Sequence, residues 1–419
     1  MAAVLAVLRG AAGMSQLEFG QLLGWSQSVV TKIERRQRRT FHDIAEVLRV
    51  CDLLGMPRDA LLPLVLGDAD AMLGNDEEVM FWEVGIGVDR RQFNHLALGT
   101  AVAALVSAPD HVDRGHVRYL QSCLEKLRDR DRAAGDGRQL SQALRLYQRA
   151  RQMLDESDYC EAVGHELVTV TAEVGNMAGW LAYDSGQQNL ARTLYIEAAQ
   201  LADSGGVPEL QAYVYANLAQ QSVHLAWPDQ QRGRAREALR FADRAADCAR
   251  HLPSPRLHAL IALRRSLAHV RLDDAPAYRS SINVARRELD RLGHCSNDPA
   301  WASFVSPSEI TGFEAMGAER LGSPGRAAEL YRSVAEDLAR SPRDRAYYRA
   351  CLAGALCAEG DTTTAVSQAL TVLPSPGEPT GSMRTLRQLR PLRNALGPSE
   401  EEFCVRFDAA VRVLTAASA

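Results

Sequence analysis

The 419-residue sequence predicts an all-α protein, in which a small N-terminal helical domain is followed by a long array of helical hairpins. Three observations lead to this fold class. Alanine and leucine are abundant and aromatic residues make up only 6% of the chain, a balance that favours helices over sheets. Helix caps and glycine turns follow one another closely in the first sixty residues. A pattern of small residues at helical spacing then recurs along most of the remaining chain.

The N-terminal domain is predicted to contain helices joined by very short turns. Ser15 and Glu18 form the capping-box pattern that starts a helix, and Gly24 is placed to end that helix. A single residue separates Gly24 from Ser26, which can cap a following helix over 27–35. Apolar spacing predicts one more helix on either side of this pair, over 4–13 and 41–54.

Two helices joined by so short a turn form a helix-turn-helix motif. The segment resembles the Xre-type, or phage-repressor-type, family of DNA-binding domains. The stretches that carry the resemblance are 14–16, 22–30 and 32–35. The resemblance implies a domain over residues 1–66 that binds double-stranded DNA.

On the helix over 27–35, Val30 and Ile33 lie three residues apart and are expected to face the core. The polar residues of its N-terminal half would then face outward, where a recognition helix reaches base edges in the major groove. Glutamine can pair with adenine through two hydrogen bonds, and hydroxyl groups can serve several bases. The resemblance adds a phosphate contact at Gln16. The predicted DNA-binding residues are Gln16, Gln27, Ser28, Thr31, Lys32, Arg35, Arg36, Arg38 and Arg39.

Positive charge is concentrated in this domain. The whole chain has 48 basic and 52 acidic residues, a net charge of −4, whereas the first 40 residues hold six basic and two acidic residues, or +4. The cationic segment therefore coincides with the predicted phosphate contacts. Glu34 is an acid among these arginines, and the resemblance implies that it pairs with Arg9 in a structural role.

Residues 67–112 are predicted to form a linker with an apolar helix, and residues 113–419 a repeat domain. The repeat consists of an alanine, a small or aromatic residue four positions on, and a small residue three further on. Glycines precede three copies by five residues and are expected to form the turns between paired helices; they are Gly186, Gly322 and Gly360. The copies begin at Ala143, Ala191, Ala238, Ala277, Ala327 and Ala365.

This pattern resembles the second helix of tetratricopeptide (TPR) repeats, which implies a TPR-like α-solenoid. The copies lie 38 to 50 residues apart, against about 34 in the ideal repeat. A generic α-helical array is the alternative. Helices expected over 383–414 would cap the stack.

A stack of this kind presents a concave surface suited to an extended ligand. The predicted ligand-binding residues lie on the first helices of the pairs. Four of them are spaced i, i+3, i+4 and i+7 and form one stripe, whose amides could hold a peptide backbone; a plain solvated stripe is the alternative. Trp180 and Tyr213 on these helices are more typical of a core. The predicted ligand-binding residues are Asn176, Asn217, Gln220, Gln221 and His224.

No catalytic residue, cofactor or metal site is predicted. The eight cysteines are scattered and contain no CxxC pair, and the chain has neither a GxxxxGK[ST] phosphate loop nor a GxSxG nucleophile elbow. These absences argue against an enzyme. No run of 18 apolar residues is present, so a cytoplasmic protein without a membrane partner is expected.

The whole layout resembles the Xre-plus-TPR regulators, including the peptide-responsive regulators of Gram-positive bacteria. It implies a cytoplasmic transcriptional regulator, a homodimer, whose array senses a peptide or another ligand, or a protein partner. Regulators of this layout in GC-rich filamentous bacteria are associated with development and antibiotic production. The alternative function is a TPR adaptor protein of a regulatory complex that does not bind DNA.

Overall fold

Helices account for the regular structure of the described part of the chain. The computed structural model describes residues 9, 15–35, 109–133, 139–226, 231–292, 298–375, 382–397 and 401–418. Within them a single isolated bridge, between His111 and Asp158, is the one β-type feature. The predicted all-α fold is therefore confirmed. The linker expected over 67–112 lies outside the described residues up to residue 108.

Two compact units divide the chain. The first comprises Met1–Glu125 and Leu144–Thr171, and the second comprises Lys126–Ala143 and Ala172–Ala419. The described helices of the N-terminal domain are α2 (Gln16–Leu23) and α3 (Gln27–Glu34). The helices predicted over 4–13 and 41–54 lie outside the described residues, Arg9 excepted.

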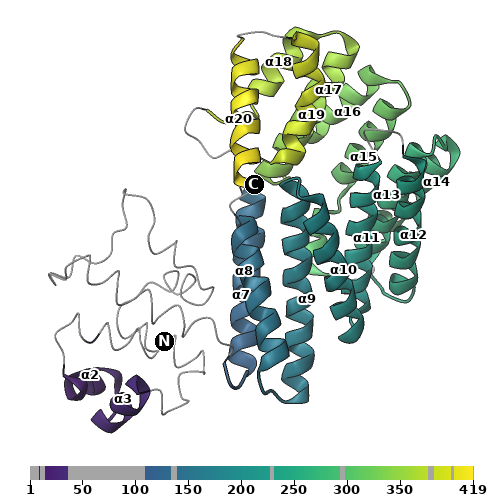
Figure 1. Ribbon diagram of the computed structural model, residues 1–419. Coiled ribbons are helices and arrows are strands. Elements are labelled where there is room, and N and C mark those ends of the chain that lie inside the picture. The colour runs from purple at the N-terminus through teal and green to yellow at the C-terminus, as the bar shows by residue number, and fades with distance from the viewer. Residues whose placement is uncertain are drawn as a thin grey trace. The chain divides into compact units, whose positions relative to one another are not determined.

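The remaining helices follow one another through short connections, as Figure 1 shows. Neighbours in sequence pack together from α10 onward, and α11, α13 and α15 also contact one another in that order. This is the packing of a helical repeat array. The helices are α7 (Arg114–Ala133), α8 (Gln139–Glu156), α9 (Glu161–Asp184), α10 (Gln188–Ser204), α11 (Pro208–Leu225), α12 (Arg232–Ala249), α13 (Pro255–Arg271), α14 (Ala275–Asp290), the 3-10 helix η3 (Ala300–Phe304), α15 (Pro307–Arg320), α16 (Pro324–Ala335), α17 (Pro342–Glu359), α18 (Thr362–Leu370), α19 (Met383–Leu396) and α20 (Glu402–Ser418).

The repeated alanine pattern lies on the even-numbered helices, which are the second helices of the pairs. In five of the six copies the leading alanine is fully buried: Ala143, Ala191, Ala238, Ala327 and Ala365. The small side chains therefore let neighbouring helices approach closely, as the sequence predicts.

The fourth copy, on α14, was predicted in a register that is wrong by one residue. Of the predicted members Ser281 is buried, but Ala277 is only half-buried, whereas Tyr278, Ile282 and Ala285, each one residue further on, are all buried. The physical reason is the tyrosine ring, which lies against α15 at Gly317, where an added Cβ would overlap it. An aromatic ring buries more apolar surface than a methyl group and so sets which face of α14 turns inward.

Glycine and Ser-Pro pairs set the helix ends. The three predicted turn glycines all have a left-handed backbone, with φ of 91° at Gly186, 80° at Gly322 and 97° at Gly360. Their predicted place between paired helices is confirmed. At helix starts, the Ser254 hydroxyl accepts a hydrogen bond from the Leu257 amide, and Pro255 opens α13. The segment 252–255 thus includes a helix start.

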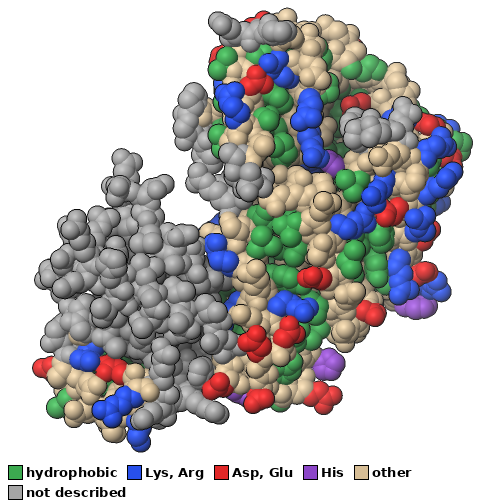
Figure 2. Space-filling model, in the orientation of Figure 1, with side chains coloured by type: hydrophobic (Ala, Val, Ile, Leu, Met, Phe, Trp, Pro, Cys, Tyr) green, Lys and Arg blue, Asp and Glu red, His purple; other side chains and the backbone are tan. Residues whose placement is uncertain are grey.

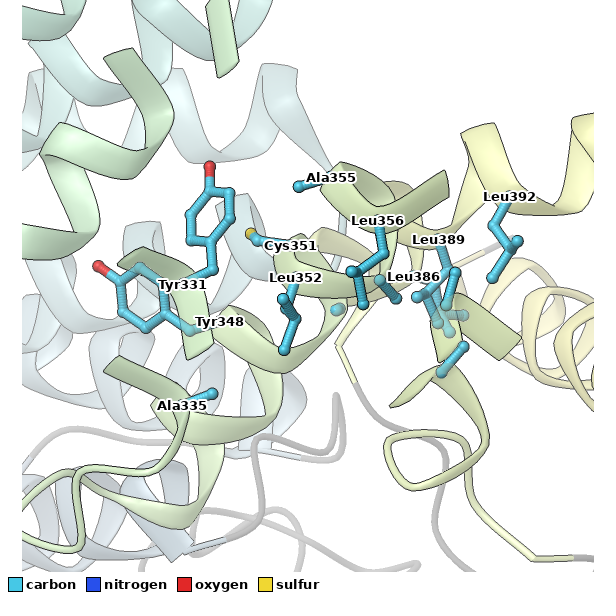
Figure 3. Packing of buried hydrophobic residues seen from close by; sticks show 14 of the residues in the cluster. Tyr331, Ala335, Tyr348, Cys351, Leu352, Ala355, Leu356, Leu386, Leu389 and Leu392 are labelled. Atoms are coloured by element: carbon cyan, nitrogen blue, oxygen red, sulfur yellow. The ribbon is translucent and has the colours of Figure 1, made fainter. Parts of the chain in front are cut away.

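The terminal helices close the described end of the array. Helices were predicted over 383–414, and α19 and α20 occupy this stretch. Buried leucines of α19 pack on α17 beside Leu356, as Figure 3 shows, and Tyr331 and Tyr348 belong to the same core further along. Phe403 and Phe407 of α20 continue the same core. The burial of this apolar surface stabilises the last repeats.

Candidate functional site

Local sequence fixes the helix-turn-helix of α2 and α3. The Ser15 amide donates to Glu18 at 2.8 Å, and the Glu18 amide donates to the Ser15 hydroxyl at 3.2 Å, which completes the predicted capping box. Gly24 ends α2 in the left-handed conformation with φ 71°. Both predictions are confirmed. Ser26 occupies the N-cap position of α3, but its hydroxyl makes no capping hydrogen bond and lies 3.0 Å from the Ser28 hydroxyl.

The packing between α2 and α3 leaves no room for a larger residue at the turn. The Trp25 amide donates to the Gly20 carbonyl at 2.7 Å. A Cβ added to Gly20 would lie 2.7 Å from the Trp25 carbonyl oxygen, too close for any side chain. Val30 and Ile33 of α3 are buried, as predicted, together with residues of α2, Phe19 and Leu23. The angle between the helices is therefore set by backbone contact and a small apolar core.

The opposite side of α3 is open to solvent. Gln27, Ser28, Lys32 and Arg35 are exposed, and Thr31 is half-buried. The helix therefore presents polar and basic side chains on one face, the arrangement expected of a recognition helix. The predicted contacts Arg36, Arg38 and Arg39 lie outside the described residues.

A hydrogen-bond network behind this face joins three segments. Arg9 donates to Glu34 from Nε at 2.6 Å and from Nη2 at 3.2 Å, so the predicted Arg9–Glu34 pair is confirmed. Gln16 donates to Glu34 at 2.6 Å and accepts from the Thr31 hydroxyl at 2.7 Å. Both amide atoms of Gln16 are thus engaged within the domain. Its phosphate contact, like the base contact of Thr31, stays a prediction.

The charge of Glu34 is stabilised by its partners. Burial acts to raise the pKa of Glu34, but the hydrogen bonds from Arg9 and Gln16 and the positive charge of Arg9 hold it below the ordinary value. The ionised pair therefore persists at neutral pH. It fixes the position of α3 relative to the segment that carries Arg9 and neutralises an acid that would repel phosphate.

A cavity in the second unit gathers part of the predicted ligand-binding set. It is lined mainly by side chains of the odd-numbered helices, including Asn176 of α9 and Asn217 and Gln220 of α11, and also by residues of η3. Both asparagines are buried, and the Asn217 amide donates to the Asn176 carbonyl at 3.0 Å. Trp180 and Tyr213 also line this cavity. The first helices of the pairs therefore supply most of its walls.

The rest of the predicted stripe turns away from this cavity. Gln221 is fully buried and donates to the Gln188 backbone carbonyl at 2.7 Å, which ties α11 to α10. His224 packs edge-on against Tyr183 and accepts a hydrogen bond from Arg387 of α19. Four residues on one helical face thus divide into two at the cavity and two between helices.

We expect the free energy of unfolding to depend on pH through His224. Burial, with the nearby charges of Arg387, Arg384 and Arg271, lowers the pKa of His224 to about 3. In the unfolded chain His224 takes up a proton near pH 6.5, whereas in the folded chain it stays neutral until about pH 3. The contribution of neutral His224 to the free energy of unfolding is therefore fully present above pH 6.5 and is lost progressively as the pH falls towards 3. We expect His224 alone to lower the free energy of unfolding by up to about 1.4 kcal/mol for each pH unit of acidification in that range.

Urea unfolding of the His224→Gln variant at pH 7, 6 and 5 measures this contribution. The variant should lose less stability on acidification than the parent protein. His251, an exposed histidine, provides the matched control, and His251→Gln should keep the parent's slope. Equal slopes for parent and His224→Gln would contradict the assignment.

A cluster of buried charged side chains lies beside the cavity and was not predicted from the sequence. Arg343 lies 2.6 Å from Asp184 and 3.3 Å from Asp131. Arg384 donates to Asp184 at 2.9 Å across 200 residues of sequence. The Trp180 ring lies beneath both guanidinium groups, 4.9 Å from Arg343 and 5.3 Å from Arg384, and its Nε1 donates to Asp131 at 3.0 Å. The cluster links α7, α9, α17 and α19.

The two acids of this cluster differ in their electrostatics. Burial raises the pKa of Asp131 above its ordinary value, and the charge of Arg343 offsets only part of that effect. Burial also acts to raise the pKa of Asp184, but the charges of Arg343 and Arg384 outweigh it, and the pKa lies below the ordinary value. Asp184 is therefore the ionised centre of the cluster.

Comparison with known sequences identifies the N-terminal domain. Residues 1–64 match a family described as a helix-turn-helix domain. This match agrees with the fold of α2 and α3 and points to a DNA-binding regulator rather than an enzyme. No curated protein sequence matches the chain. Within the described residues, no group of three or more potential ligands could hold a metal ion, and no helix has the length and apolar character of a membrane span.

Proposed function

We propose that the protein is a transcriptional regulator that binds double-stranded DNA through α3. One observation carries the proposal. Val30 and Ile33 anchor α3 in the core, and this leaves Gln27 and Ser28 exposed at its N-terminal end. These side chains can reach base edges in a major groove, where glutamine pairs with adenine. Lys32 is exposed on the same helix and can contact phosphate.

The distribution of charge supports a DNA contact in this domain. Over the helical array, the face drawn in Figure 2 mixes basic and acidic side chains. The first 40 residues of the sequence, in contrast, have a net charge of +4. Phosphate binding follows the local density of basic residues, so the N-terminal domain is the favoured contact.

The helical array is the proposed sensing part of the regulator. We assign the N-terminal domain to the Xre type and the array to the TPR-like type, and we propose that the array senses a ligand, such as a peptide, or a protein partner. The buried alanines of the even-numbered helices and the cavity between the odd-numbered helices support this assignment. One recognition helix covers few base pairs, so we further propose a homodimer in the cytoplasm.

The Gln27→Ala variant tests the reading of bases. We expect the variant to bind the best duplex more weakly by about 1–3 kcal/mol and to discriminate less at one base-pair position, because a two-bond contact to adenine is lost. Gln21, exposed on α2, gives the matched control Gln21→Ala, which should keep the parent's affinity and preference.

Fluorescence anisotropy on a panel of duplexes with single base-pair changes measures both quantities. An unchanged preference at every position in Gln27→Ala would remove this residue from the proposed interface. If the parent protein bound no duplex at all, the adaptor function would be favoured instead.

A further inference from the structure

Arg264 of α13 is a buried cation without an acidic partner. Its side chain lines the cavity of the second unit and is only 4% exposed. Its Nε has no hydrogen-bond partner, and no carboxylate among the described residues forms an ion pair with it. Its guanidinium carbon lies 5.5 Å from the centroid of the Phe313 ring. The charge of Glu309 also acts on Arg264, but that carboxylate forms its ion pair with Arg340. Burial of an unpaired guanidinium is costly, so an anion in the cavity would stabilise the folded protein.

The other arginines of the cavity wall are already neutralised. Arg128 lies 3.0 Å from Glu173, and Arg340 pairs with Glu309, which also accepts from the Tyr348 hydroxyl. The buried cluster of Asp184 and Asp131 occupies the remaining buried arginines. Among the described residues, Arg264 is thus a buried arginine of the wall without an ion pair of its own, and it favours a ligand with a carboxylate.

Polar and aromatic groups beside Arg264 define the rest of the ligand. The Gln220 Oε1 atom is buried without a hydrogen-bond partner and can accept from a donor group. Tyr213 and Trp301 are stacked with ring centroids 3.9 Å apart and planes inclined by 10°, and both line the cavity. The cavity volume is about 150 Å³, the size that accommodates a single benzene-like ring.

We propose that this cavity binds a small aromatic carboxylate, whose carboxylate pairs with Arg264 and whose ring lies against Tyr213 and Trp301. This ligand would be the one that the helical array senses, so the inference rests on the proposed function. Its test contains no DNA, so its failure leaves the DNA-binding proposal untouched, and failure to bind DNA leaves the ligand site intact.

Isothermal titration of the full chain with benzoate, and with its neutral counterpart benzamide, tests the charge. Benzoate should bind at least tenfold more tightly than benzamide and should raise the Tm of the protein. Acetate, which has the charge but not the ring, should also bind at least tenfold more weakly than benzoate. Equal binding of benzamide would overturn the role of Arg264, and equal binding of acetate would overturn the aromatic part of the site.

The Arg264→Gln variant tests the residue itself. We expect at least a tenfold loss of benzoate affinity, with no decrease in the Tm of the unliganded protein, because the variant removes an unpaired buried charge. Arg279→Gln, at an exposed arginine of α14, should bind benzoate like the parent. A folded Arg264→Gln protein with the parent's affinity would overturn the proposal. If that variant does not fold, the comparison of benzoate with benzamide on the parent protein decides.

Discussion

Asp184→Asn is expected to lower the free energy of unfolding by about 3–5 kcal/mol. Asp184 lies 2.6 Å from Arg343 and 2.9 Å from Arg384, and all three side chains are buried. Asparagine has nearly the same shape but no charge, so two guanidinium groups would remain buried with Asp131 as their only acid in the cluster. Equilibrium unfolding in urea at pH 7 measures the loss.

A surface pair provides the control for this prediction. Asp243 lies 2.7 Å from Arg265, and its side chain is 62% exposed. Asp243→Asn should therefore change the free energy of unfolding by less than about 1 kcal/mol. Comparable losses in the two variants would contradict the view that the buried cluster holds α7, α9, α17 and α19 together.

Reversal of charge on the outward face of α3 is expected to reduce DNA affinity on the order of 100-fold or more if α3 reads DNA as proposed, because like charges placed together across an interface cost several kcal/mol. The variant combines Lys32→Glu, at an exposed position of α3, with Arg35→Glu at its exposed C-cap. If each residue contacts one phosphate, replacement of both by alanine should reduce the slope of log affinity against log salt by about 2.

The matched control reverses two exposed arginines far along the chain, Arg279 and Arg287 of α14. This variant has the same change in net charge but should retain most of the parent's affinity at physiological salt. If both double variants lost affinity equally, net charge rather than the face of α3 would govern binding, and the assignment of α3 would be wrong.

Features that depend on neighbouring residues could be predicted from the sequence. The Ser15–Glu18 capping box and the left-handed Gly24 involve atoms within a few residues of one another, and both are confirmed. The alanine pattern located the second helices because close packing needs small side chains at fixed helical spacing. It gave the wrong register on α14, where Tyr278 had to fit against a glycine of another helix.

Features that depend on distant partners could not be predicted. Helical spacing predicts that Gln221 and His224 share a face of the helix with Asn217. It does not predict which neighbouring helix packs against each of these residues. Gln221 bonds to α10 and His224 meets α19, so neither lines the cavity. Arg384 and Asp184 are 200 residues apart, and no local pattern marks such a pair.

The most direct test of the proposed function is selection of bound duplexes from a random pool by the full-length protein, repeated with the Lys32→Glu and Arg35→Glu double variant. We expect the parent to enrich one recurring sequence and the variant, with its array still folded, to enrich none. If the parent enriched no sequence at low salt, or the variant selected the same one, the outward face of α3 would not be a DNA-reading surface.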